Sequence, residues 1–417
     1  MSFTSLECRA CRTDFPALAR TQDGQPLAYL DGPGGTQVPQ RVIDTISRAY
    51  SHHNANRHGP FVTSAEVDDT MLRARQVIAD FLGAENYRCI SLGANMTTLS
   101  YCLSHALARA LLPGDEIVVT QLDHEANRAP WTRLRAQGFA VHEIEFKPDG
   151  RLDESDMRSK IGPRTKIVAL GYSSNALGTV NAVEMARELT AAVGAYLVVD
   201  AVHYAPHFPL NLKDLGADFV LCSSYKFYGP HVGILYTRPG LSETLKTDVL
   251  PVQEQAPPHL FETGTLNHPA IEGVTAAIEY IASWGAGQTL RSKIVDAMDN
   301  IRAYEHALGR YYYEEVQRIP GVRVWGTDFS TDCRAPTVSI TLDSMTAPKL
   351  AQMLGGLGFC LWAGHFYAPR PIEVLGLDPQ EGLLRMGISM YNDESEIERL
   401  LEALRGIAAK KSALQSG

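Results

Sequence analysis

The middle of the chain alternates short apolar runs with longer segments of helical periodicity. Four runs have the length and composition of buried strands: Ile117–Thr120, Thr165–Leu170, Tyr196–Asp200 and Phe219–Cys222. Helical stretches such as Val183–Ala192 separate them. Because parallel strands need a long crossover connection, this alternation predicts an α/β fold whose mostly parallel sheet carries helices on both faces. The run over 234–236 follows too soon for a crossover helix, and we expect an antiparallel or adjacent strand there.

The last third of the chain has a different pattern. A loop rich in Pro and Gln over 251–258 precedes two helical regions, at about 270–283 and 290–318. Strands over 322–325, 337–342, 359–362 and 384–388 then alternate with helices over 347–357 and 394–408. We expect three parts: an N-terminal segment over 1–28 that packs with the small domain, a large domain over 29–290, and a small α+β domain over 291–417.

Composition and charge restrict the partners. With 38 Lys and Arg against 47 Asp and Glu, the net charge is −9, and the basic residues form no block. Neither nucleic acid nor an anionic membrane is expected as a partner. No apolar run is long enough to span a bilayer, and the first residues lack the apolar core of a secretory signal. We therefore expect a cytoplasmic protein.

The seven cysteines are scattered, and their number is odd. This distribution predicts no disulfide framework. Cys8 and Cys11 form a CxxC sequence, but neither a second pair nor a histidine cluster accompanies it. We expect two thiols on a first helix and no metal site.

Asp200 ends the expected strand over 196–200. Open α/β folds bind ligands at this carboxyl edge of the sheet. Taken alone, an aspartate after a strand is more often a helix cap or a turn residue.

Lys226 follows another expected strand and lies between two aromatic residues, Tyr225 and Phe227. Such a lysine either extends along the surface or is partly buried. Burial would lower its pKa and make the amine a usable nucleophile.

A third polar stretch, Gly-Ala-Asn-Met-Thr-Thr-Leu over 93–99, precedes a helical run over 100–112. Free N–H groups and threonine hydroxyls at the start of a helix can bind an anion such as phosphate. The alternative is a plain helix cap.

Together the three stretches describe one site for pyridoxal phosphate. This cofactor needs a lysine for its Schiff base, a carboxylate beside its pyridine nitrogen, and an anion pocket for its phosphate. One helix and one strand between Asp200 and Lys226 would return the chain to the same sheet edge. A carboxylate ~4 Å from the pyridinium would gain about 4 kcal/mol at an effective dielectric constant near 20.

The chain resembles the fold-type I pyridoxal-phosphate enzymes of the class V aminotransferase group, within its cysteine desulfurase-like branch. The motifs VDAVHYAPH, SSYKFYGPHVGILY, SNALGT and FETGTLNH carry this resemblance, which extends over residues 29–392. It implies the fold-type I transferase fold, bound pyridoxal 5'-phosphate, an α-amino acid substrate and a homodimer with shared active sites.

The resemblance also implies roles at the cofactor. Lys226 would carry the cofactor and move the Cα proton, Asp200 would pair with the pyridine nitrogen, and His124 would stack on the ring. His203, where the branch usually has Gln, would lie near the phenolic oxygen. The phosphate would be held by Met96, Thr97, Ser223, Tyr225 (usually His in this branch) and, from the other subunit, Thr265.

The resemblance also implies two residues that bind the substrate. Arg385 matches the arginine that binds an amino-acid α-carboxylate, a task suited to its planar donors. Asn175 matches the asparagine that assists it.

The resemblance breaks at one loop. Desulfurases of this branch read approximately Arg-Ala-Gly-His-His-Cys-Ala, whereas this chain has Trp-Ala-Gly-His-Phe-Tyr-Ala over 362–368. Tyr367 takes the place of the cysteine that accepts sulfur, and a phenol cannot form a persulfide. His365 and Tyr367 remain candidates for proton transfer. Cys360 lies nearby, but its alternating position fits a buried strand better.

The reaction therefore stays open. Carbon–sulfur lyase chemistry by β-elimination is favoured, because the scaffold it resembles cleaves such bonds. Epimerisation or racemisation, a substitution or cyclisation of secondary metabolism, and transamination are the alternatives. A non-catalytic binding protein with this fold is disfavoured by the retained Lys226, Asp200, Asn175 and Arg385. A nicotinamide enzyme, suggested by Gly-Pro-Gly-Gly over 32–35, is disfavoured because the spacing is not GxGxxG.

Overall fold

A seven-stranded sheet forms the centre of the large domain in the computed structural model, which describes residues 3–343 and 345–415. Its strands are β4 (Ile90–Gly93), β5 (Glu116–Thr120), β6 (Ala140–Ile144), β7 (Thr165–Gly171), β8 (Tyr196–Asp200), β9 (Phe219–Ser223) and β10 (Gly233–Thr237). Their spatial order is β4-β10-β9-β8-β7-β5-β6. Strands β5 to β9 run parallel, and β10 is antiparallel to both of its neighbours. The predicted fold class and the strands predicted for the large domain are confirmed, while β4 and β6 were not predicted.

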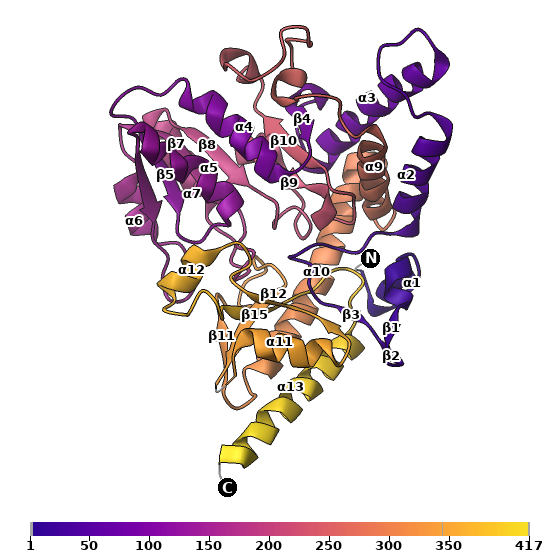
Figure 1. Ribbon diagram of the computed structural model, residues 1–417, viewed down its shortest axis with the longest axis vertical. Helices are drawn as coiled ribbons and strands as arrows, with labels where there is room; N and C mark the ends of the chain where they lie inside the picture. The colour runs from indigo at the N-terminus through magenta and orange to yellow at the C-terminus, as the bar shows by residue number, and fades with distance from the viewer. Residues whose placement is uncertain (1–2, 344, 416–417) are drawn as a thin grey trace.

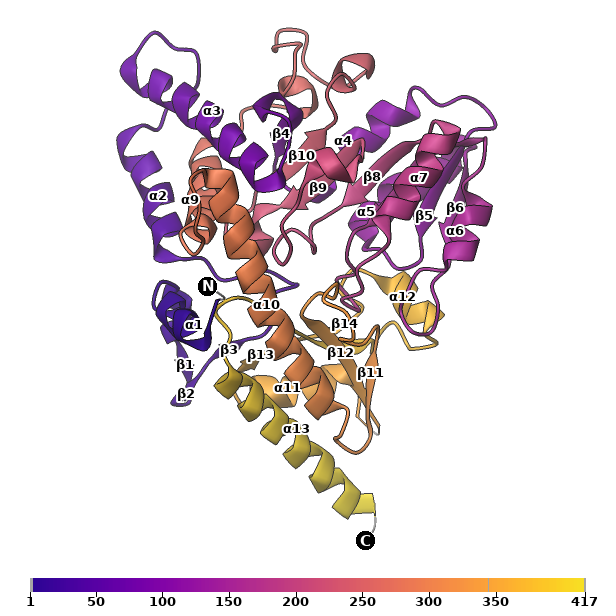
Figure 2. The ribbon, with the colours of Figure 1, turned by 180° about the vertical axis from the view of Figure 1, so that it is seen from behind.

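Helices cover both faces of this sheet (Figures 1 and 2). Helices α4 (Met96–Ala108) and α5 (Glu125–Thr132) pack on the face that presents Ile117 and Val119. Helices α6 (Glu154–Lys160), α7 (Val183–Val193) and α8 (Leu212–Leu215) pack on the opposite face, which presents Val118. Alternate residues of a strand point to opposite faces, so a strand buried on both sides is apolar throughout, and this explains the continuous apolar runs in the sequence.

Two more helices, α2 (Gln40–His52) and α3 (Val62–Leu82), each pack against α9 (His268–Ala282) beside the β4 edge. The long helix α10 (Leu290–Val316) then runs from the large domain to the small one (Figure 2). The helices predicted over 270–283 and 290–318 are confirmed.

The small domain is built on a four-stranded antiparallel sheet in the order β11-β12-β15-β14. Its elements are β11 (Val322–Trp325), β12 (Thr337–Leu342), α11 (Ala347–Gly355), β14 (Trp362–Gly364), α12 (Pro369–Val374), β15 (Leu383–Gly387) and α13 (Glu394–Gln415). Helices α10, α11 and α13 share one apolar core with this sheet.

One strand prediction needs correction. The single strand expected over 359–362 is two short strands in different sheets. Strand β13 (Phe359–Cys360) pairs in parallel with β3 (Ala28–Tyr29), and β14 joins the small-domain sheet. The chain changes sheet at this point, which an apolar run in sequence does not reveal.

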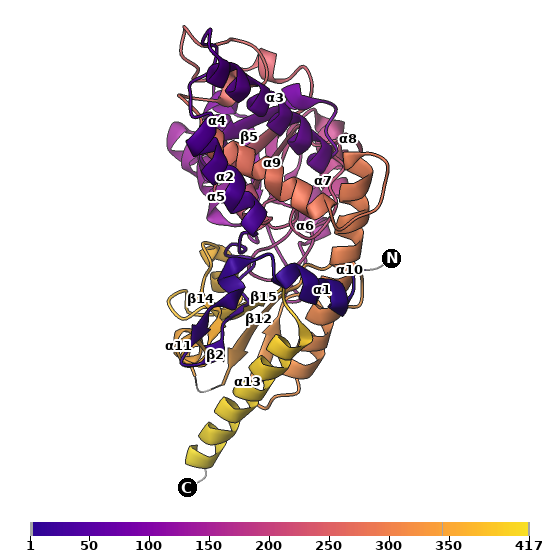
Figure 3. The same cartoon turned by 90° about the vertical axis from the view of Figure 1, so that its right-hand side faces the viewer.

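The N-terminal helix α1 (Ser5–Arg12) lies where the two domains meet (Figure 3). Its Cys8 and Cys11 are buried, and their thiols donate to the carbonyls of Asn392 and Met390. The following Phe15 contacts Tyr228 of the large domain. Strands β1 (Thr21–Gln22) and β2 (Gln25–Pro26) then form a hairpin. The N-terminal segment thus contacts both domains, and the predicted domain boundaries stay a prediction.

Among the described residues, no helix combines the length and the hydropathy needed to cross a membrane.

Candidate functional site

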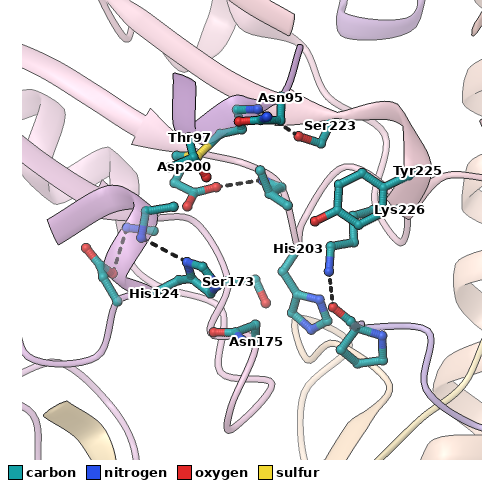
Figure 4. A pocket seen from close by; sticks show the side chains of 16 residues that line it. Asn95, Thr97, His124, Ser173, Asn175, Asp200, His203, Ser223, Tyr225 and Lys226 are labelled. Atoms are coloured by element: carbon teal, nitrogen blue, oxygen red, sulfur yellow. Dashed lines mark hydrogen bonds between the residues drawn. The ribbon is translucent and has the colours of Figure 1, made fainter. Parts of the chain in front are cut away.

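A cavity opens at the carboxyl ends of β7, β8 and β9, beside the first turns of α4 and α5. It holds about 610 Å³ of empty space, part of it open to solvent. The predicted site residues that line it are Met96, Thr97, His124, Asn175, Asp200, His203, Ser223, Tyr225 and Lys226 (Figure 4).

Asp200 is the last residue of β8, and its side chain reaches this cavity. One carboxylate oxygen accepts a hydrogen bond from the N–H of Val202 at 2.9 Å. Burial raises the pKa of Asp200 to about 7, and the neighbouring carboxylate of Asp123 adds to the rise. The group is therefore suited to a cationic partner, which would lower that pKa again.

Lys226 lies in the turn that follows β9, and it is buried rather than extended along the surface. Its Nζ donates to the carbonyl of Pro33 and lies 4.9 Å from the centre of the Tyr225 ring. Burial lowers the pKa of Lys226 to about 7, and the charge of Arg385 lowers it further. A substantial fraction of this amine is thus unprotonated at neutral pH, as a nucleophile requires.

The start of α4 forms one end of the cavity. The helix begins at Met96, earlier than the predicted start at 100, because Asn95 caps it by accepting from the N–H of Thr98 at 2.9 Å. The N–H of Met96 donates to the hydroxyl of Ser223 at 3.1 Å. A Cβ on Gly233 would lie 2.3 Å from the backbone of Asn95, so β10 and this turn need a glycine for their close contact. The N-terminal end of a helix attracts anions, and Met96 and Thr97 of the first turn of α4 line the cavity.

His124 caps α5, and its Nδ1 accepts from the N–H of Ala126 at 2.9 Å. Burial lowers the pKa of His124 to about 4, and the charges of Lys226 and Arg385 add to this effect. A neutral, flat ring therefore faces the cavity.

Several buried polar atoms around the cavity have no partner within the described part of the chain. They are Oγ of Ser173, Oδ1 of Asn175 and Nδ1 of His203. The other ring nitrogen of His203 is 3.1 Å from the Thr337 hydroxyl of the small domain. Buried polar atoms are normally satisfied, so these positions indicate a polar ligand.

Arg385, predicted to bind a substrate carboxylate, does not line the cavity itself. Its guanidinium is 3% exposed and donates to Asp31 Oδ1 at 2.7 Å and to the carbonyl of Asn175 at 3.1 Å. The Phe366 ring lies over the guanidinium at 4.3 Å. The amide of Asn175 in turn donates to the carbonyl of Phe366 at 2.9 Å.

The loop that carries Phe366 also brings Tyr367 to the site. The Tyr367 ring stacks on His124 with 5.8 Å between ring centres, and its carbonyl accepts from the N–H of Glu125 at 2.8 Å. Tyr367 is 70% exposed. Its backbone N–H donates to the Nδ1 of His365 at 3.1 Å. Cys360, by contrast, is half-buried in β13, and burial raises its pKa. Neither Tyr367 nor His365 lines the cavity itself, and the tyrosine, not a thiol, is the side chain that the loop places against His124.

Thr265 lies outside this cavity. It lines a separate hollow together with Asn56, Arg57 and Val252. Its expected role at the site of another subunit stays a prediction.

Sequence reasoning missed three residues near the site. Asp123 lines the cavity, and its carboxylate accepts from the N–H of Gly171 at 2.8 Å. Pro33 contacts Lys226, and Asp31 contacts Arg385. The unusual turn Asp-Gly-Pro-Gly-Gly over 31–35 was the available signal for the latter two. Within the described ranges, no group of three or more His, Cys, Asp and Glu side chains is arranged to hold a metal ion.

Comparison with known proteins gives consistent matches. A family model described as aminotransferase class-V matches residues 28–400. A probable cysteine desulfurase of Mycolicibacterium paratuberculosis is 36% identical over 97% of this chain, and the chain spans 58% of its length. A probable cysteine desulfurase of Vibrio cholerae is 30% identical over 96% of this chain and 98% of its own length.

Solved structures agree with these matches. The apo cysteine desulfurase of Thermococcus onnurineus NA1 has a TM-score of 0.87 and 26% identity, covering 96% of this chain and 98% of its own. The cysteine desulfurase CsdA of Escherichia coli has a TM-score of 0.83 and 25% identity, covering 97% of this chain and 98% of its own.

Proposed function

Because the chain belongs to the aminotransferase class-V family, whose members use pyridoxal 5'-phosphate, we propose that it cleaves a carbon–sulfur bond of an α-amino acid by β-elimination. The relatives and solved structures named above are cysteine desulfurases or probable ones, and this supports the bond type. The observation that carries the proposal is the meeting of Lys226 and Asp200 in one cavity, each with its pKa shifted by burial to about 7.

The residues around the cavity fit this cofactor. Lys226 offers an amine that is partly unprotonated at neutral pH, and Asp200 offers a buried carboxylate suited to the cationic pyridine nitrogen. The N-terminal end of α4, where Met96 and Thr97 line the cavity, suits a phosphate. When bound, pyridoxal phosphate supplies an electron sink that makes the Cα–H bond of an attached amino acid acidic.

The side chains around the cavity then transfer the Cα proton, cover the cavity and bind the substrate carboxylate. Lys226 holds the proton taken from Cα at its Nζ, since its pKa near 7 lets the amine accept and return a proton. The neutral ring of His124 covers one side of the cavity. Arg385 and Asn175 bind and orient the substrate carboxylate, because a planar guanidinium recognises a carboxylate through paired hydrogen bonds.

The leaving sulfur needs a proton donor and a route out of the cavity. His365 and Tyr367 lie on the loop beside His124, and we assign proton transfer to the leaving sulfur to this pair. Tyr367 cannot accept sulfur as a persulfide, so the thiol or sulfide leaves as a free product.

The test is a panel of amino acids that includes cysteine and cystine, assayed for pyruvate, sulfide or thiol, and change of chirality. We expect pyruvate together with a sulfur product, and loss of both in Lys226→Ala. Lys349→Ala, at an exposed position on α11, is the matched control and should keep wild-type turnover. Full turnover by Lys226→Ala, or racemised substrate without pyruvate, would contradict the proposal.

The proposal includes a homodimer that works in the cytoplasm. Thr265 lines a hollow outside the cavity, and the neighbouring Val252 is 93% exposed, which supports a second copy covering this surface. Light scattering should give twice the mass of one chain, and cell fractionation should recover the protein in the cytoplasmic fraction.

A further inference from the structure

Arg385 is already engaged by the protein's own groups. Asp31 Oδ1 is 2.7 Å from its Nη2, the carbonyl of Asn175 accepts from Nη1, and Phe366 covers the guanidinium face. Its Nε is buried without a partner among the described residues. The residue expected to bind a substrate carboxylate thus already holds a carboxylate, and it is closed off from the cavity beside it.

The turn that contains Asp31 fixes its backbone and leaves room for its carboxylate. The N–H groups of Gly34 and Gly35 both donate to the carbonyl of Asp31. A Cβ on Gly34 would lie 2.1 Å from Asp31 Oδ2, so only glycine leaves room for this carboxylate. Pro33 of the same turn accepts from the Nζ of Lys226. The turn over 31–35 therefore contacts both the lysine and the arginine of the site.

Groups other than Asp31 also position the guanidinium. Residue 385 lies in β15, which is paired on both sides by β12 and β14, and Phe366 and the Asn175 carbonyl fix its side chain. What Asp31 adds is negative charge, which a buried guanidinium needs when no ligand is bound. A substrate carboxylate would bring a second negative charge to the same guanidinium, and two like charges at one site repel each other.

We propose that Asp31 occupies the place of the substrate carboxylate on Arg385 in the free protein and gives it up when a carboxylate ligand binds. This inference rests on the carboxylate-binding role of Arg385 in the proposed function. Asp31 is thus a specificity-determining residue: a ligand gains access to Arg385 only if it brings its own anionic group to replace the aspartate.

The experiment uses propionate, which has a carboxylate but no amine that could join the cofactor. Its Kd is measured by calorimetry on the cofactor-loaded wild type and on Asp31→Asn. We expect Asp31→Asn to bind propionate about fivefold more tightly, because asparagine does not compete as an anion. Equal or weaker binding by Asp31→Asn, or no binding to either protein, overturns the proposal.

Two controls separate charge from packing. Asp23→Asn, a substitution of the same type in the exposed turn between β1 and β2, should bind propionate as the wild type does. Propionamide has the same shape without charge and should gain nothing from Asp31→Asn. An equal gain for propionamide, or for Asp23→Asn, overturns the proposal.

A second measurement needs no variant. A crystal structure of the wild type with propionate should show the ligand on Arg385 and the Asp31–Arg385 oxygen–nitrogen distance beyond ~4 Å, the limit of an ion pair. Propionate bound elsewhere, or an intact Asp31–Arg385 pair beside it, overturns the proposal. Neither measurement involves turnover, so a failure of carbon–sulfur cleavage would be recognised separately.

Discussion

At the scale of single residues, burial sets the charge of the two central side chains. Lys226 and Asp200 start from ordinary pKa values of 10.5 and 3.8, and burial brings both to about 7. Each group therefore approaches neutrality in the protein without its cofactor, which limits the cost of burying a charge. A cationic ring nitrogen beside Asp200 would favour the carboxylate form again.

The first prediction follows from the raised pKa of Asp200. Above about pH 7 the folded protein holds a buried carboxylate, whereas below about pH 4 both the folded and the unfolded chain are protonated there. Asp200→Asn keeps the acceptor for the Val202 N–H and removes this charge. In the cofactor-free protein it should raise the free energy of unfolding by about 2–4 kcal/mol at pH 8, with the gain vanishing towards pH 4. Urea titrations at both pH values check this; a pH-independent effect would contradict it.

The second prediction concerns the loop residue that replaces the expected sulfur acceptor. Tyr367→Cys places a thiol at a position that is 70% exposed and beside His124. We expect this variant to acquire a persulfide when it is incubated with cysteine and cofactor, seen by mass spectrometry as one added sulfur on residue 367. Cys360→Ser in the same background is the control and should leave the added sulfur in place. Sulfur on Cys360 instead would show that the loop thiol is not the acceptor.

At the scale of elements, helix and strand ends carry the chemistry. Strands β8 and β9 end at Asp200 and Ser223, and α4 begins at Met96 against the Ser223 hydroxyl.

This junction gives the third prediction. Asn95→Ala removes the cap of α4 and should cost about 1 kcal/mol of stability, together with a loss of affinity for pyridoxal phosphate. Asp153→Ala removes the cap of α6, away from the cavity, and should cost similar stability with unchanged cofactor affinity. Thermal unfolding and fluorescence titration compare the two; equal cofactor affinities would contradict the role of α4.

The same scale shows what sequence patterns can and cannot predict. Strands buried on both faces, such as β8, were predicted with their observed bounds because their apolar runs are continuous. The start of α4 was missed because Asn95 was not recognised as its cap. The loop at Phe366 and Tyr367 has positive φ angles of 54° and 57°, a conformation that is uncommon for bulky residues and is imposed by contacts with the large domain. Such tertiary effects leave no local sequence signal.

At the scale of the whole molecule, the small domain contacts residues that line the cavity of the large one. Thr337 of β12 reaches His203, and Arg385 of β15 reaches Asn175. Motif resemblance named His203, Arg385 and Asn175, whose roles stay predictions, but it did not name Thr337. It did not reveal that Asp31 pairs with Arg385, because the two residues are 354 positions apart and meet only in the folded structure.

The central claim is that Lys226 carries pyridoxal phosphate in this cavity, and the most direct test is chemical. The purified protein with added cofactor is scanned for a visible absorbance band, reduced with borohydride, digested, and mapped by mass spectrometry. We predict a band that disappears on reduction and a single phosphopyridoxyl group on Lys226, absent from Lys226→Ala. A protein that stays colourless, or a modification spread over exposed lysines with Lys226 unmodified, would contradict the account.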